Sequence, residues 1–194
     1  MDVSDADLIE QSIRDPECFA EIFDRYGGEI LRYVQARLGP ELAQDVTAET
    51  FLAAFRHRER FDPAFGGARP WLYGIATRQI GKQRRTEARR LRLLRSAAGK
   101  AAAEAVTADF SGRAAERVTA EGLRPRLARL LAAMAPLDRE LLLLVAWGGL
   151  SYQEAAAALG TTVAAAKARL HRIRVRTRTE LDEINPLAQE VRHG

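Results

Sequence analysis

The chain contains 194 residues, of which 47% are hydrophobic and 29% charged, a composition typical of folded globular domains. Its single cysteine, Cys18, excludes an intramolecular disulfide and a cysteine-rich zinc site, and it fits a reducing compartment. The acidic first residues do not resemble a signal peptide, and no run of about 18 apolar residues occurs, so we expect no membrane span.

Charge is distributed unevenly along the chain. The net charge is +4, but residues 1–62 contain 14 acidic and 7 basic residues, which leaves the remainder of the chain at +11. An acidic first part followed by a basic body predicts two kinds of partner, a basic protein surface and a polyanion.

Two amphipathic helices are predicted in the first third of the chain. Residues 19–38 form the first, ended by Gly39-Pro40, and residues 41–58 form the second. The apolar face of the first comprises Phe19, Ile22, Phe23, Tyr26, Ile30, Tyr33 and Val34. The buried face of the second comprises Val46, Phe51, Leu52 and Phe55, and its other side carries Gln44, Asp45, Thr47 and Glu49.

A third helix follows a loop at residues 61–69 and runs from Pro70 to about Arg95. Its apolar positions include Trp71, which we expect to pack in the core. Its later part carries eight cations against a single acid, Glu87, which is more than a helix end alone explains and points to a polyphosphate partner. These cations are Arg78, Lys82, Arg84, Arg85, Arg89, Arg90, Arg92 and Arg95.

The next stretch, residues 96–122, is rich in Ala, Gly, Ser and Thr and is predicted to be a flexible linker. Apolar periodicity then resumes in two helices. The face of the first comprises Leu127, Leu130, Leu131 and Met134, and the second spans residues 137–147 and ends at Gly148-Gly149.

Residues 151–178 have the pattern of a helix-turn-helix. Ser151 and Glu154 predict a capping box, and Gly160 is suited to the turn between the helices. Thr162 caps the second helix, whose apolar stripe comprises Val163, Ala166, Leu170 and Ile173. The other faces are basic without an acid, through Lys167, Arg169, His171, Arg172, Arg174, Arg176 and Arg178.

No catalytic constellation is apparent. The sequence lacks a phosphate-binding Gly loop, a His-Glu metal helix and a Ser-centred elbow, and the three histidines are scattered. We therefore expect a protein that is not an enzyme, with no cofactor and no metal. The fold class expected is all-α, with two helical domains joined by a flexible linker.

Three stretches together resemble the extracytoplasmic-function (ECF) sigma factors of bacterial RNA polymerase. They are AQDVTAETFLAAFRHRERFD at 43–62, RPWLYGIATRQIGKQRR at 69–85 and LDRELLLLVAWGGLSYQEAAAALGTTVAAAKARLHRIRVR at 137–176. The resemblance implies sigma region 2 at residues 1–95, a linker at 96–126, the region 4 helix-turn-helix at 127–185 and a tail at 186–194.

The resemblance also implies roles for individual residues in a cytoplasmic, bacterial initiation factor. Core polymerase would be bound by Asp45, Glu49 and Thr50. The −10 element would be held by Phe61, Phe65, Arg78, Lys82, Arg84 and Arg85. The −35 element would be held by Lys167, Ala168, Arg169, His171, Arg172, Arg174 and Arg176. The implied partners are core polymerase, promoter DNA and an anti-sigma factor, without a membrane or a small-molecule substrate.

Some positions depart from the family pattern. Arg78 stands where the family usually has Asn, and Ala165 and Ala168 lack the hydroxyls usual at the start of the recognition helix. Two other classes also remain open. A conventional helix-turn-helix regulator leaves the acidic helix unexplained, and an interaction scaffold needs no helix that fits a DNA groove.

Overall fold

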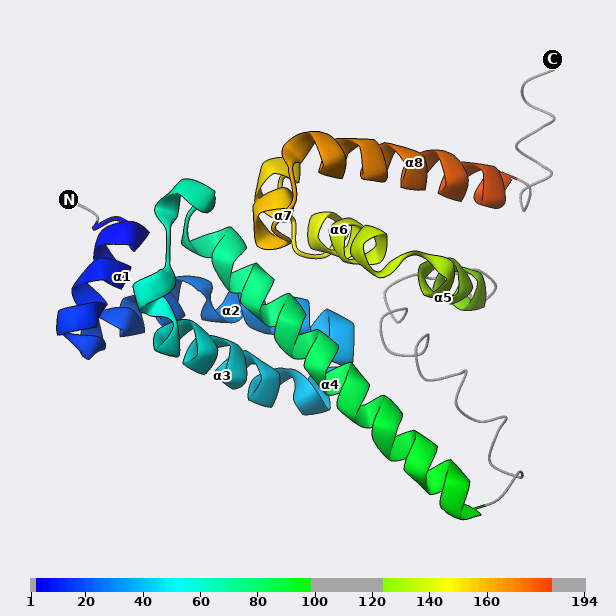
Figure 1. The fold of residues 1–194 in the computed structure, drawn as a ribbon, viewed down its shortest axis with the longest axis horizontal. Coiled ribbons are helices and arrows are strands. Elements are labelled where there is room, and N and C mark those ends of the chain that lie inside the picture. Colours follow the sequence, from blue (N-terminus) through cyan, green and yellow to red (C-terminus); the bar gives the residue numbers. More distant parts are fainter. Residues whose placement is uncertain (1–2, 99–123, 183–194) are drawn as a thin grey trace.

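The computed structural model describes residues 3–98 and 124–182, and all regular structure in these ranges is helical (Figure 1). The predicted all-α class is therefore confirmed for this part of the chain. The first module comprises α1 (Asp5–Arg14), α2 (Phe19–Leu38), α3 (Pro40–Arg56) and α4 (Ala68–Ala98), with short 3-10 turns at Pro16–Cys18, Arg58–Arg60 and Pro63–Phe65. The second comprises α5 (Arg124–Ala133), α6 (Pro136–Ala146), α7 (Tyr152–Ala158) and α8 (Val163–Asp182).

Helix boundaries follow the local chemistry of the sequence. Pro40 begins α3 and Pro136 begins α6, because a first-turn residue needs no helical partner for its amide. Gly39 has a φ of 84°, a conformation that other residues rarely adopt, and it permits the tight reversal between α2 and α3. Pro70 is the third residue of α4 rather than the first, still within the turn where an amide lacks a partner.

Both ends of the predicted linker belong to helices. Residues 96–98 belong to α4 and residues 124–126 to α5, where Pro125 is tolerated in the first turn. Residues 99–123, which make up the rest of that prediction, and the predicted tail at 186–194 lie outside the described residues.

Most residues of the predicted apolar stripes are buried or partly buried, and four are exposed. Ile22, Ile30 and Val34 are fully buried, as expected. Phe23 of α2 and Leu52 of α3, predicted to be buried, are 49% and 48% exposed. The ring of Phe23 packs edge-on against Phe51, with 4.9 Å between centroids, so the pair continues the core out to the surface. The exposed stripe residues of the second module are Leu127 and Val163.

The two modules pack directly against each other, contrary to the expectation of a loose joint. Helix α4 contacts α2 and α3 on one side and α7 on the other (Figure 1), and buried residues of both modules belong to one hydrophobic cluster. The approach is closest at Gly74 of α4, where a β-carbon would lie 2.6 Å from the carbonyl oxygen of Ala158. A glycine is needed there because any side chain would push α7 away.

A methyl group at Gly74 should separate the modules without unfolding α4. In Gly74→Ala the helix gains propensity, but the overpacked contact costs about 1–3 kcal/mol. We expect faster hydrogen exchange in residues 152–158, while residues 19–54 keep their protection.

Gly81→Ala is the matched control, since a β-carbon there lies 3.5 Å from the Arg85 side chain and meets no backbone. It should stabilise the chain by up to about 1 kcal/mol and leave exchange in α7 unchanged. Unaltered protection of α7 in Gly74→Ala would contradict the packing described.

Candidate nucleic-acid and protein interfaces

The recognition-helix surface is the outer side of α8. Ala166, Leu170 and Ile173 are buried against the rest of the module, which fixes the rotation of the helix. The opposite side is exposed and predominantly basic, and we define the recognition-helix surface as Lys167, Ala168, His171, Arg172, Arg174 and Arg176.

The sequence signals of the helix-turn-helix are confirmed. The Ser151 side chain accepts from the Glu154 amide at 3.2 Å, and the Ser151 amide donates to Glu154 Oε2 at 2.8 Å. Gly160 has a φ of 63°, and the Ala165 amide donates to Thr162 Oγ1 at 3.1 Å. The capping box sets where α7 begins, Gly160 permits the turn after it, and Thr162 sets where α8 begins.

Arg169 differs from its neighbours on α8. Its Nη1 donates to Asp138 Oδ1 of α6 at 2.7 Å, and both side chains are partly buried. The guanidinium thus ties α8 to α6. Arg174 lies over the ring of Tyr152, with 5.5 Å from its guanidinium carbon to the ring centroid, while its side of the helix remains exposed.

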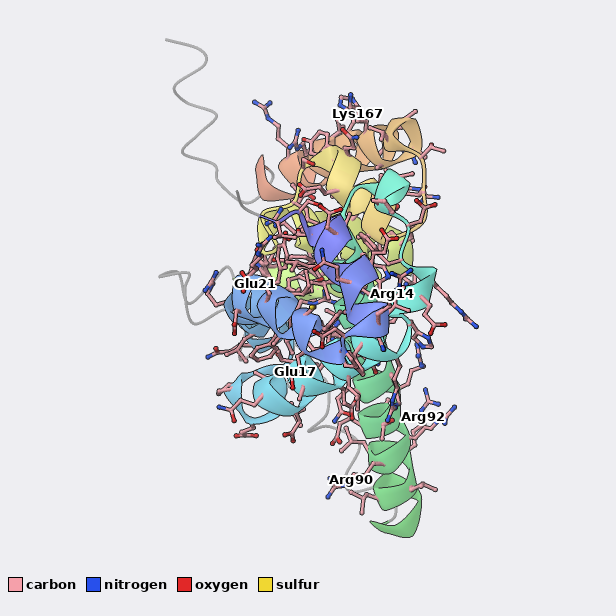
Figure 2. The ribbon with its side chains drawn as sticks, turned by 90° about the vertical axis from the view of Figure 1, so that its left-hand side faces the viewer. Arg14, Glu17, Glu21, Arg90, Arg92 and Lys167 are labelled. Atoms are coloured by element: carbon pink, nitrogen blue, oxygen red, sulfur yellow. The ribbon has the colours of Figure 1, made fainter. Side chains whose placement is uncertain are left out.

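The far end of the α4 basic surface lies at the opposite end of the molecule from the recognition-helix surface. Figure 2 labels Lys167 at one end of the molecule and Arg90 and Arg92 at the other. The exposed cations that define the α4 basic surface are Arg78, Lys82, Arg85, Arg89, Arg90 and Arg92. Two cationic surfaces this far apart suit two separate segments of a polyanion.

Arg84 was predicted to belong to this set, but the structure turns it inward. Its Nη2 donates to the carbonyl oxygen of Arg37 at 3.0 Å, and the side chain is half-buried. Burial, with the nearby charge of Arg37, lowers the pKa of Arg84 to about 10. Arg84 therefore supports the packing of α4 on α2 and is not part of the exposed basic surface.

The loop before α4 combines aromatic packing with backbone anchoring. Phe61 is half-buried and packs on Trp71 with 5.1 Å between ring centroids, which confirms the packing role expected for Trp71. Arg58 donates to the carbonyl oxygens of Ser12 and Phe55, at 3.1 and 2.6 Å, and so holds the loop to α1 and α3. The side chain of Phe65 lies outside the described residues.

The acidic α3 face presents Asp45, Glu49 and Leu52, spaced four and three residues apart and therefore on one side of the helix. All three are exposed. Phe23 of α2 is exposed as well, and its ring packs edge-on against Phe51 of α3. Thr50, predicted to belong to this contact set, is fully buried, and its hydroxyl donates to the Val46 carbonyl at 2.7 Å. Thr50 is therefore a packing residue, and Leu52 takes its place at the surface.

A cluster of polar side chains between the modules was not predicted from the sequence. Tyr73 Oη lies 3.0 Å from Glu29 Oε1 and 3.1 Å from the Gly148 carbonyl oxygen. Arg69 donates to Glu29, Glu154 and Gly148, and buried Arg37 donates to Glu140 of α6. Since the pairs are 40 to 103 residues apart in the chain, no local pattern could have indicated them.

Two further features concern only the described residues. No group of three or more His, Cys, Asp or Glu side chains there is arranged to hold a metal ion. None of the helices in the described ranges is both long enough and apolar enough to cross a membrane.

Comparison with known proteins identifies both modules. Residues 22–90 match the model of Sigma-70 region 2, and residues 124–176 match that of Sigma-70, region 4. The RNA polymerase sigma factor NccH of Alcaligenes xylosoxydans xylosoxydans is 30% identical, with 84% of this chain and 86% of that protein aligned. The ECF RNA polymerase sigma factor SigK of Mycolicibacterium vanbaalenii is 27% identical, with 86% and 83% aligned.

A solved structure has the same arrangement of helices over most of the chain. The structure of CnrH in complex with the cytosolic domain of CnrY superposes with a TM-score of 0.59 and 25% sequence identity. It covers 92% of this chain and 97% of CnrH.

The burial of Arg84 and the exposure of Arg85 make these neighbours a matched pair. Arg85→Ala should weaken binding of single-stranded DNA and reduce the slope of log affinity against log salt by about 0.7, the value for one lost phosphate contact. Arg84→Ala should leave that slope unchanged, because its guanidinium faces a carbonyl of the protein. Fluorescence anisotropy over a salt series measures both, and equal slopes for the two variants would contradict the assignment.

Proposed function

The chain belongs to the ECF sigma factors of RNA polymerase, and we propose that its three exposed surfaces divide promoter-directed initiation among them. The acidic α3 face docks on core polymerase, the loop before α4 with the α4 basic surface engages the −10 element, and the recognition-helix surface reads the −35 element. The observation that carries this division is that the two exposed cationic surfaces lie on different helices, α4 and α8, and the exposed acidic face on a third, α3.

Docking on core polymerase uses both charge and apolar contact. Asp45 and Glu49 steer a basic partner surface, since charge complementarity mainly accelerates and orients association. Leu52 and Phe23 add apolar area, which supplies affinity once the surfaces meet. Large exposed apolar side chains, Leu52 on α3 and Phe23 packed against α3, are expected at a protein interface.

The −10 element is engaged as an unpaired strand. A base that leaves the stack can be held on an aromatic ring, and the sequence of the loop contains two candidates, Phe61 and Phe65. Arg78, Lys82 and Arg85 project from the next turns of α4 and neutralise phosphates. Arg78 lies nearest the loop in the sequence and therefore takes the edge of the base site.

The −35 element is read in the major groove by α8. Lys167, His171 and Arg172 lie in the first half of the helix, the part that reaches base edges in this motif. Arg172 paired with guanine through two hydrogen bonds is worth about 1–3 kcal/mol of base discrimination. Arg174 and Arg176 hold phosphates, whereas Arg169 is engaged with Asp138 and positions the helix.

The protein acts as a non-catalytic subunit in the bacterial cytoplasm, where polymerase and promoter DNA are found. A further protein partner, an anti-sigma factor, controls its release. CnrH, which covers most of this chain, was solved with the cytosolic domain of CnrY bound, and this supports a protein regulator here as well.

Run-off transcription tests the proposed function directly. Fragmented genomic DNA is transcribed by core polymerase with and without the protein, and the 5′ ends of the transcripts are sequenced. We expect start sites that appear only with the protein and that share two sequence elements upstream. Duplex binding by the protein alone, without new start sites, would instead favour a conventional helix-turn-helix regulator.

The docking role of the acidic α3 face predicts a selective loss of core binding. Reversing two charges in Asp45→Lys/Glu49→Lys should slow association with core polymerase at least tenfold at low salt, because steering is lost. Biolayer interferometry measures the association rate. Glu10→Lys/Glu17→Lys makes the same charge change at other exposed acids and should keep the wild-type rate. Equal effects of both double variants would remove the assignment.

A further inference from the structure

Arg69 lies at the contact between the two modules and is shared by both. Within the first module its Nε donates to Glu29 Oε1 at 2.7 Å. Across the boundary its Nη1 donates to Glu154 Oε1 at 3.0 Å, and its Nη2 donates to the Gly148 carbonyl oxygen at 3.0 Å. The hydrogen bonds to Glu29 and Glu154 raise the pKa of Arg69, so the guanidinium is charged at any physiological pH.

The same boundary covers the loop that precedes α4. A β-carbon built on Gly66 would lie 3.3 Å from the β-carbon of Ala157, which places α7 in van der Waals contact with the loop. Arg69 follows this loop in the first turn of α4. The first helix of the helix-turn-helix thus lies over the edge of the surface that, under the proposed function, engages the −10 strand.

The chemistry of Arg69 suits a phosphate as well as a carboxylate. A guanidinium presents its N–H donors in a planar fork that pairs with either anion in the same geometry. Glu29 comes from the same module and orients the fork whether or not the second module is present. Glu154 comes from the other module, and its carboxylate occupies the remaining side of the fork.

We propose that Glu154 occupies the place of a DNA backbone phosphate on Arg69, so that the helix-turn-helix module covers one edge of the −10 surface until the two modules separate. This inference rests on the proposed function and adds to it one DNA-binding residue, Arg69, and one residue that masks it. Glu154 then has two roles, since its Oε2 also accepts from the Ser151 amide in the capping box.

A second contact across the boundary makes the closed arrangement specific but easy to open. Buried Arg37 donates from Nη2 to Glu140 Oε1 at 2.8 Å and from Nη1 to Tyr33 Oη at 2.7 Å. Arg37 Nε and Glu140 Oε2 are buried without a hydrogen-bond partner in the structure. A buried ion pair with unsatisfied atoms adds little net stability, because water solvates both charges once the modules part.

Glu154→Gln tests the masking role with little change to the fold. Glutamine keeps the capping box, which accepts Glu or Gln at this position, but removes the charge that holds Arg69. Affinity for a fluorescent single-stranded DNA of about 12 nucleotides and mixed sequence should rise about three- to fivefold, the factor expected for a partly exposed ion pair. Ser151→Ala is the matched control, since it weakens the same capping box without touching Arg69 and should leave the affinity unchanged.

Energy transfer between two dyes reports separation of the modules. The dyes are attached to Gln35→Cys on α2 and Gln153→Cys on α7, both at exposed positions, in a Cys18→Ser background. Transfer should fall in Glu154→Gln and fall further in Glu140→Gln, which leaves Arg37 buried without its counter-charge. Adding core polymerase to the unaltered sequence should lower transfer as well.

Three results would overturn the inference. One is wild-type affinity and transfer in both Glu154→Gln and Glu140→Gln. Another is lower transfer without a gain in DNA affinity, since separation would then expose no binding residue. The last is an equal gain from Glu154→Gln in an Arg69→Ala background, because Arg69 would not be the masked group. Start sites in run-off transcription do not depend on this mask, so loss of those start sites would count against the proposed function instead.

Discussion

The packing of α4 against three helices is the constraint on which the rest of the structure depends. Leu72, Ala76 and Ile80 are fully buried, and this part of α4 contacts both α2 and α3. On its other side Gly74 admits the backbone of α7 at a distance that no side chain permits. Both modules pack on α4. The helix that carries the α4 basic surface therefore also sets the position of the helix-turn-helix.

Charge at the module boundary contributes specificity more than stability. Hydrophobic burial around Leu72 and Ala155 can supply the attraction, since each lies in the shared cluster. Burying the ion pairs of Arg37 and Arg69 costs desolvation free energy that their mutual attraction only partly offsets. Any other alignment of the modules would leave these charges without partners, so the pairs favour this alignment. The partial burial of Glu154 by itself raises its pKa, and hydrogen bonds from Ser151 and Arg69 outweigh that effect and lower it. The carboxylate is therefore held in its charged form, as an anion mimic must be.

Local structure was predictable from the sequence, and contacts between distant segments were not. The capping box of Ser151 and the turn at Gly160 depend only on neighbours in the chain, and both are confirmed. Burial of Phe23 and Leu52 was predicted wrongly, because apolar periodicity cannot distinguish a core position from an exposed interface position on the same stripe. The structure places Thr50 and Arg84 away from the surfaces expected of them for a related reason. Residue type suggests a contact, but only packing decides whether the side chain reaches the surface.

No local sequence pattern predicted the direct contact between the modules. The composition of residues 96–122 describes how the chain connects them and says nothing about whether they touch. That contact requires Gly74 to face Ala158 and Arg37 to meet Glu140, pairings separated by 84 and 103 residues. From the sequence alone, Gly74 is interpreted as a small helix residue, and Arg37 and Glu140 as solvated charges. Their contacts between the modules are visible only in the folded structure.

The surfaces left open in this arrangement imply an order of events. Asp45, Glu49 and Leu52 are exposed while the modules are in contact, and so is the outer side of α8. Within the surface proposed for the −10 element, α7 lies against the edge of the loop at Gly66 and the guanidinium of Arg69. Core polymerase can therefore dock on the acidic α3 face before the modules part. The −10 strand must wait for that step, because its phosphate and the Glu154 carboxylate compete for the same side of Arg69. A protein built in this way keeps the Arg69 edge of its single-strand surface covered until the modules part.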